Sequence, residues 1–304
     1  MTPQALTPQG FLNLYKLAGW TSHDCVAKVR RILSQKRVGH GGTLDPAAVG
    51  VLPIAVGRAT RLINYLSSDK AYRATIRFGV TTTTDDLEGE VIAEAPVPHL
   101  TLDDVTAILP RFEGQIDQIP PQYSAISVDG KRAYDLARAG QVVDIPIRTV
   151  TVYRIEVLAW RSLPYPELEV AIACSAGTYI RSIARDLGDQ LQTGAALAHL
   201  IRTRSSGFVL EESITLDDLL AGWTAGENLF IPPEQALQHL PLLTLDGETA
   251  RRWQQGQKVA IAPPTTSLHY RVHGEDQTFL GVGEWIDPTA DQPPRLRPRV
   301  VYDP

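Results

Sequence analysis

The chain has little cysteine and no long apolar run, and both absences narrow what it can be. No stretch of its 304 residues approaches the roughly 18 consecutive apolar residues of a membrane span. The first ten residues are polar and lack the apolar core of a signal peptide. Its two cysteines, Cys25 and Cys174, form no CxxC pair and no cysteine–histidine zinc pattern. We therefore expect a cytosolic protein with reduced, partly buried thiols, no membrane contact and no metal ion.

The chain also lacks an excess of positive charge, since its formal net charge is -5. The distribution of charge is nevertheless uneven. Residues 26–68 contain seven lysines and arginines and a single acid, Asp45, whereas residues 85–119 contain nine acids and one base. This asymmetry indicates one face for a polyanion and another that faces water. Basic residues on an ordinary solvated helix would produce the same pattern, so charge alone leaves nucleic-acid binding open.

Local patterns predict the first helix and the loop that follows it. Thr21 and Asp24 have the spacing of a capping box, so a helix should begin after Thr21. The glycines of residues 39–42 should end this helix in a tight loop that contains His40 and Asp45.

The remaining patterns predict strands and helices without regular alternation. Strands are expected at residues 51–56, 70–80, 150–160 and 167–174, and helices at residues 62–66, 102–112 and from residue 180. We therefore expect an α+β fold with a mixed, mainly antiparallel sheet. The proline-rich segment 232–241 indicates a domain boundary, which predicts a larger domain over residues 1–235 and a small β domain over residues 240–304. Residues 120–145 are polar and basic and predict a long arm.

Asp45 is the first candidate for chemistry, because it is the only acid in its basic stretch and lies on a glycine-rich loop. A carboxylate surrounded by cations keeps its charge and can act as a nucleophile or a base. The alternative is an Asp-Pro turn in which Asp45 bonds its own backbone. The local pattern alone favours the turn.

Six motifs, which follow one another along the chain, favour the catalytic role of Asp45 over the turn. They lie at residues 10–23, 37–54, 70–73, 82–89, 120–140 and 174–181, and the second contains Arg37-Val38-Gly39-His40-Gly41-Gly42-Thr43-Leu44-Asp45-Pro46. Together they resemble the motifs of the TruB family of tRNA pseudouridine synthases, over roughly the first 210 residues. The chain departs from the family pattern at Leu17, Ala47, Val49, Ser127 and Ile201.

The resemblance implies roles for individual residues. It implies that Asp45 is the nucleophile and that Arg181 pairs with it and fixes its direction. It implies that Tyr72 stacks on the target base and is a candidate acceptor of the C5 proton. Without the motifs, Tyr72 would be assigned to the core, because it shares a strand face with Ile76 and Phe78, and Arg181 to a helix surface. The matched motifs further imply substrate contacts for His40, Tyr179, Leu200, Lys16, Arg132 and Arg138.

The resemblance also implies the reaction and the substrate. Converting uridine to its C-glycoside isomer breaks N1–C1′ and rejoins the base through C5, without redox change, so no cofactor is expected. The implied substrate is the T-loop of tRNA at position 55, whose uridine must leave its stack before a side chain can reach the sugar. The small domain would be PUA-like.

Two other functions remain possible on this pattern. One is a tRNA-binding or tRNA-folding module without catalysis, which could also accompany catalysis. The other is a synthase that works inside a guide-RNA particle, although the chain lacks the long basic tails that would favour it. We expect neither a guide RNA nor an obligatory protein partner.

Overall fold

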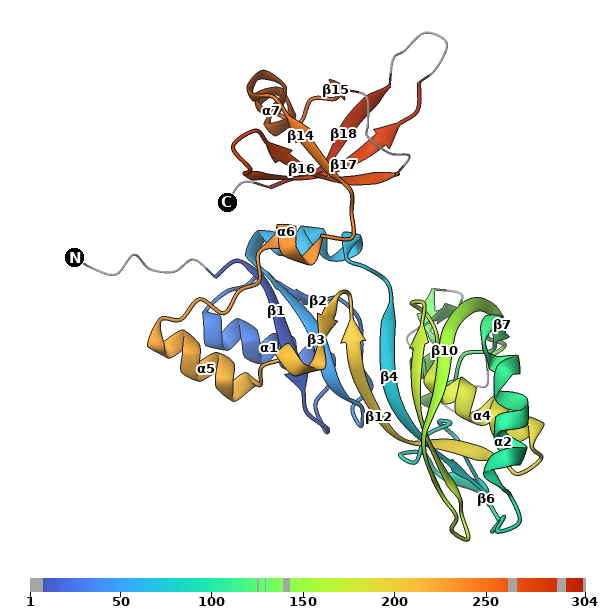
Figure 1. Cartoon of the computed structure of the whole chain (residues 1–304). Coiled ribbons are helices and arrows are strands. Elements are labelled where there is room, and N and C mark those ends of the chain that lie inside the picture. The colour runs from blue at the N-terminus through green and yellow to red at the C-terminus, as the bar shows by residue number, and fades with distance from the viewer. Residues whose placement is uncertain are drawn as a thin grey trace.

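The computed structural model describes residues 8–124, 126–128, 130–138, 143–261, 267–288 and 294–302. Its larger sheet has the strand order β1-β3-β12-β4-β11-β10-β7, with β2 paired to β3 and β13 to β12 (Figure 1). The strands are β1 (Gly10–Lys16), β2 (Val38–His40), β3 (Val49–Val56), β4 (Lys70–Phe78), β7 (Gly114–Gln118), β10 (Arg148–Arg161), β11 (Glu167–Cys174), β12 (Ala195–Ser205) and β13 (Phe208–Val209). The pair β3–β12 is parallel and the other pairs are antiparallel. The predicted α+β fold with a mixed, mainly antiparallel sheet is confirmed.

Helices flank this sheet, and three of those named below begin at a capping box. They are α1 (Ser22–Leu33), α2 (Leu102–Ile108), α4 (Ile180–Gln190) and α5 (Leu216–Ala225), with 3-10 helices η1 (Gly57–Tyr65), η2 (Leu109–Phe112) and η3 (Leu210–Glu212). The capping box at Thr21 and Asp24 is present, and a polar cap of this kind is worth about 1 kcal/mol. Within the described residues, no helix is long and apolar enough to cross a membrane.

The predicted glycine loop after α1 is wrong in detail. The helix ends at Ser34, which has a left-handed φ of 50° and bonds the carbonyls of Arg30 and Arg31. Gly39 and His40 then belong to strand β2, which pairs with β3. Glycines commonly end helices, but Ser34 already completes the last turn here, and the residues that follow gain ladder hydrogen bonds as a strand.

Gly50 makes the parallel contact between β3 and β12 possible. Its φ is +106°, and a Cβ there would lie 2.3 Å from the carbonyl oxygen of Arg202. Gly50 and Arg202 are register partners. Because no other residue fits so close to that backbone, this glycine brings β12 against the strand that follows the Asp45 loop.

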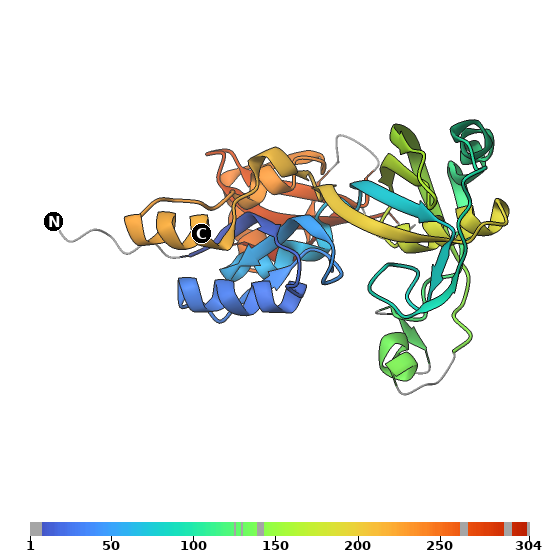
Figure 2. The same cartoon turned by 90° about the horizontal axis from the view of Figure 1, so that it is seen from below.

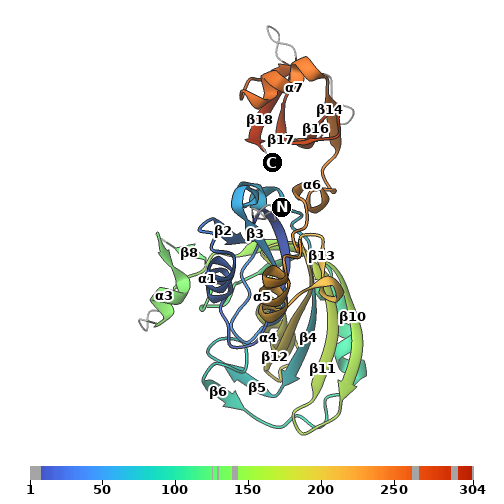
Figure 3. The same cartoon turned by 90° about the vertical axis from the view of Figure 1, so that its left-hand side faces the viewer.

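The predicted arm is a small structure of its own. It contains β8 (Ser127–Val128), β9 (Lys131–Arg132) and α3 (Ala133–Arg138), with Ile126, Ala133 and Ile145 as its apolar cluster. Figures 2 and 3 show it on the same side of the molecule as α1. Residues 125, 129 and 139–142 of the predicted arm lie outside the described residues. Below the main sheet, β5 (Val80–Thr82) and β6 (Val91–Glu94) form a hairpin.

The C-terminal segment forms a second sheet in the order β14-β16-β17-β18-β15. After α6 (Pro233–Ala236), its elements are β14 (Leu242–Leu245), α7 (Gly247–Gln254), β15 (Val259–Ala260), β16 (His269–Gly274), β17 (Phe279–Ile286) and β18 (Arg295–Val301). Trp253 and Tyr270 lie in its own core. Phe279 and Tyr302, however, belong to a cluster that also contains Phe11 of β1. The two sheets therefore share apolar contact.

Candidate active site

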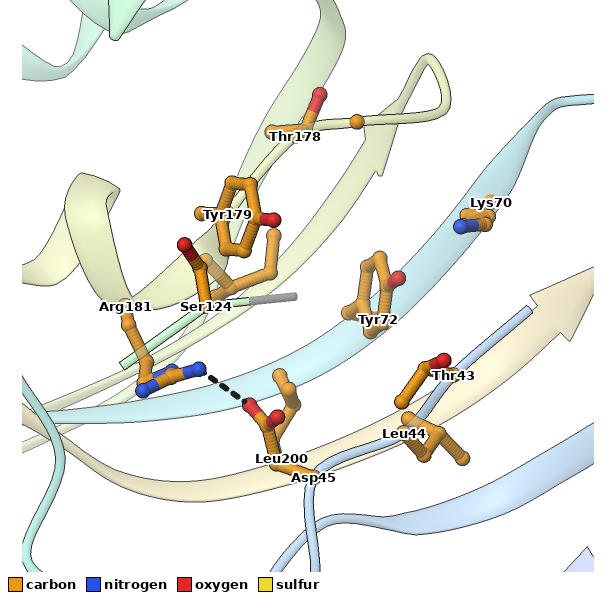
Figure 4. A pocket seen from close by; sticks show the side chains of 12 residues that line it. Thr43, Leu44, Asp45, Lys70, Tyr72, Ser124, Thr178, Tyr179, Arg181 and Leu200 are labelled. Carbon is orange, nitrogen blue, oxygen red and sulfur yellow. Dashed lines mark ion pairs between the residues drawn. The ribbon is translucent and has the colours of Figure 1, made fainter. Parts of the chain in front are cut away.

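A pocket of about 240 Å³ opens where the Asp45 loop, β4, the base of the arm and the start of α4 meet (Figure 4). Its walls include Thr43, Leu44, Asp45, Lys70, Tyr72, Ser124, Tyr179, Arg181 and Leu200. Segments far apart in sequence therefore place one carboxylate, two phenols and two cations around one space. Among the described residues, no three histidine, cysteine or acidic side chains are grouped to hold a metal ion.

Arg181 fixes the direction of the Asp45 carboxylate. Its Nη2 lies 3.0 Å from Asp45 Oδ2, and the two side chains are 7% and 44% exposed. The same guanidinium donates to the carbonyl oxygens of Thr84 and Tyr123 at 3.0 and 3.1 Å, and lies 3.5 Å from Asp86 Oδ2. Arg181 is thus a buried residue and not a surface helical arginine. Because it is held on several sides, it orients Asp45 while leaving that carboxylate accessible from the pocket.

Lys16 has a different position from the one expected of a substrate contact. It is fully buried, and its Nζ donates to the carbonyl oxygens of Leu17, Trp20 and Pro46 at 3.0, 2.8 and 3.1 Å. Burial lowers the pKa of Lys16 to about 8. As placed, Lys16 holds the backbone beside Asp45 and is not part of the pocket wall.

Arg202 holds the other side of the same loop. It is fully buried, and its guanidinium donates to the carbonyl oxygens of Val51, Thr43 and Gly42 at 2.7, 3.1 and 3.1 Å. It also stands opposite Tyr72 in the β12–β4 register, so its charge lies near the Tyr72 phenol and favours the ionised form. No local pattern predicts this role, since an arginine in a strand usually points to solvent.

Tyr72 is both a core residue and a pocket residue, the two positions that the sequence left open for it. It is 6% exposed and packs in the core cluster of α4 and β4, yet it also lines the pocket. Burial raises the pKa of Tyr72 to about 12, and the nearby charge of Arg202 opposes that rise. The phenol is therefore neutral near pH 7, with a cation in place to stabilise negative charge on its oxygen.

Tyr179 and Leu200 complete the pocket wall as expected from the motifs. The backbone of Tyr179 exchanges two hydrogen bonds with the side-chain amide of Gln118, at 3.0 and 3.1 Å. This contact holds the start of α4 against the base of the arm.

His40 is not part of the pocket wall. His40 packs edge-on against His23 with ring centroids 5.4 Å apart, and its Nδ1 accepts from the backbone N–H of Gly42 at 3.3 Å. The side chains of Arg132 and Arg138 lie outside the described part of the chain.

We expect Lys16→Met to slow turnover and lower the melting temperature while leaving RNA affinity nearly unchanged. Methionine roughly keeps the length of the side chain but removes a donor from three part-buried carbonyls. The carbonyl of Pro46 still accepts from the Gly19 N–H at 2.9 Å, and each carbonyl left without a donor costs about 1–3 kcal/mol. The measurements are thermal melting, single-turnover rate and equilibrium RNA binding at several salt concentrations. If Lys16 contacted phosphate instead, the salt dependence of binding would become shallower and the melting temperature would stay the same.

Comparisons with known proteins match family models to most of the chain. The family model for the N-terminal domain of TruB family pseudouridylate synthases matches residues 30–180. Two models of TruB C-terminal domains match residues 181–240 and 241–301. A solved chain in an H/ACA ribonucleoprotein bound to a substrate RNA has a TM-score of 0.73 at 26% identity, covering 97% of this chain and 85% of its own. A Cbf5-Nop10-Gar1 complex contains a chain with the same TM-score at 27% identity, covering 95% and 84%.

Curated relatives match over nearly their whole length. A protein named tRNA pseudouridine synthase B from a Nostoc species is 55% identical over 296 residues, which is 97% of this chain and 99% of the relative. The protein of the same name from a Synechocystis species is 56% identical over 295 residues, again 97% and 99%. With the family models and these relatives in agreement, the chain belongs to the TruB family of pseudouridine synthases.

Proposed function

We propose that this enzyme converts the uridine at position 55 in the T-loop of tRNA to pseudouridine, with Asp45 as the nucleophile. The observation that carries the proposal is the Asp45–Arg181 ion pair, whose carboxylate is 44% exposed at the pocket while its partner is buried. Such a carboxylate is charged, oriented and reachable, as attack on a ribose carbon requires. The curated relatives are named for tRNA, which supports this substrate class.

The reaction requires one bond to break, one to form and one proton to move. Asp45 either bonds C1′ as N1–C1′ breaks and leaves C1′ when C5 bonds to it, or removes the C2′ proton as N1–C1′ breaks and returns it when C5 bonds to C1′. The base turns between the two steps. The proton on C5 then leaves, and N1 gains a proton. Tyr72 is the candidate acceptor, and the buried Arg202 would stabilise the charge that develops on its oxygen.

The target uridine must leave its stack to reach Asp45, which costs a few kcal/mol. Tyr72, Tyr179 and Leu200 offer aromatic and apolar surface that offsets this cost once the base is inside. We assign His40 to the space left by the extruded nucleotide, because it lies next to the Asp45 loop but outside the pocket wall. Arg132 and Arg138 of the arm remain proposed contacts to the RNA backbone.

We further propose residues 1–235 as the catalytic domain and residues 240–304 as a small PUA-like RNA-binding domain. The enzyme would act alone, without guide RNA or an obligatory protein partner. The near-complete coverage of relatives named for tRNA at 55–56% identity favours this over the guide-particle neighbours at 26–27% identity.

Asp45→Asn should abolish turnover and keep tRNA affinity within about tenfold, roughly 1.4 kcal/mol. Asparagine preserves the shape of the side chain and removes the nucleophile. Purified protein is incubated alone with an unmodified tRNA transcript, and pseudouridine and binding are both measured. Asp103→Asn, on the exposed first turn of α2, is the matched control and should behave as wild type. Product from a clean Asp45→Asn preparation would refute the assignment.

Tyr72→Phe should keep RNA binding and lose most single-turnover activity, because it removes only the hydroxyl. The pKa of Tyr72 is raised to about 12, so its phenolate fraction grows tenfold per pH unit below that value. If the phenolate is the acceptor and proton removal limits the rate, the wild-type rate should rise between about pH 6 and 9, and this slope should vanish in Tyr72→Phe. Tyr153→Phe, whose exposed hydroxyl bonds Asp69, is the control. A near wild-type rate for Tyr72→Phe would leave Tyr72 with a packing role alone.

The RNA-binding role of the C-terminal sheet is best tested in the full chain, because truncation would uncover the apolar cluster around Phe11. Arg251 and Arg252 are exposed on the last turn of α7. Replacing both by glutamine should weaken tRNA binding and flatten its salt dependence while sparing the saturated single-turnover rate. A double variant of the exposed Arg111 and Arg154 removes the same charge from the outer end of the main sheet and should change binding less. Equal losses in both variants would argue against a specific role for α7.

A further inference from the structure

Lys70 lines the pocket but has no role in the proposed reaction. It is the first residue of β4 and lines the same pocket as Asp45 and Tyr72. Figure 4 shows Tyr72 between Lys70 and the Asp45–Arg181 pair. The side chain is half-buried. Within the described residues, its ammonium has no hydrogen bond and no ion pair.

Among the described residues, no ion pair joins an acidic side chain to Lys70, and the groups that act on its charge are Arg202 and Cys174. Burial lowers the pKa of Lys70, and the nearby charge of Arg202 lowers it further. Cys174 is the cross-strand partner of Lys70, and burial raises the pKa of its thiol to about 11, so it carries no charge near pH 7. The preceding residue, Asp69, accepts a hydrogen bond from Tyr153. A partly desolvated cation beside another cation is unfavourable unless an anion joins it.

Gly42 leaves the backbone beside Lys70 and Arg202 without a side chain. Gly42 has a φ of +154°, and a Cβ there would lie 3.5 Å from Lys70 Nζ and 3.7 Å from Arg202 Nη1. A side chain at this position would thus occupy space directly against both cations. Its absence leaves that space open to a ligand.

We propose that Lys70 binds a backbone phosphate next to the uridine that enters the pocket. This rests on the proposed function, because it takes RNA as the ligand. Uracil and ribose carry no charge, so the phosphate is the anion that RNA can supply. The Asp45 carboxylate is already paired with Arg181, and Tyr72 lies between this ion pair and Lys70, so Asp45 is not the anion that Lys70 binds. Binding the phosphate there would hold the backbone of the flipped nucleotide while the base reaches past Tyr72 to Asp45.

The test is a cycle that changes the lysine and the phosphate separately. A T-arm stem-loop is made with a neutral methylphosphonate on the 5′ or the 3′ side of the target uridine, and binding is measured to full-length Asp45→Asn protein with and without Lys70→Gln. We expect Lys70→Gln to weaken binding of the unmodified RNA about tenfold or more, as for loss of a charged hydrogen bond. Lys70→Gln should have almost no further effect on the RNA whose methylphosphonate replaces the phosphate that Lys70 binds. Lys70→Arg should retain most of the affinity.

Arg73→Gln is the matched control. Arg73 lies on the same strand, but its side chain faces away from the pocket and pairs with Glu169. Its effect should be the same on all three RNAs. If Lys70→Gln weakens binding equally on charged and neutralised RNAs, or not at all in a protein that melts normally, Lys70 does not contact a flanking phosphate. Turnover of wild-type protein on the unmodified stem-loop is measured separately, so a failure of the proposed function is distinguishable from a failure of this contact.

Discussion

The loop that carries Asp45 is held by hydrogen bonds from two buried cations to its backbone carbonyls. Lys16 binds the carbonyl of Pro46 on one side, and Arg202 binds those of Gly42 and Thr43 on the other. Hydrogen bonds from charged donors are among the stronger contacts in a protein. Because the cations bond backbone and not the Asp45 carboxylate, the loop is fixed while the carboxylate is left to Arg181 and the substrate.

Two strands and one helix that are distant in sequence must therefore meet for the Asp45 side chain to be placed. Lys16 ends β1, Arg202 lies on β12, and Arg181 comes from α4. The parallel contact at Gly50 sets how closely β12 approaches β3. Burying these cations costs desolvation free energy. In return the loop is preorganised, so it needs no rearrangement when charge develops in the reaction.

Much of the fold could be predicted because its signals are local. The capping box at Thr21 depends on two residues three apart, and the alternation from Lys70 to Phe78 depends on a two-residue period. The end of α1 at Ser34 could not be predicted, because several nearby residues, including the glycines, could also have ended the helix. A serine rarely adopts the left-handed conformation that ends it here. The motifs singled out Asp45, Tyr72 and Arg181, and the fold brings all three to one pocket.

The sequence by itself determined the family, the fold class and the residue types available for chemistry, because motif order and hydrophobic period are properties of the chain. Only the tertiary structure decided which cations face the backbone and which face the pocket. Lys16 and Lys70 are both lysines on strands, yet one is fully buried among carbonyls and the other lines the pocket. Their difference arises from long-range packing, in which desolvation and available carbonyl partners are set by strands that are distant in sequence.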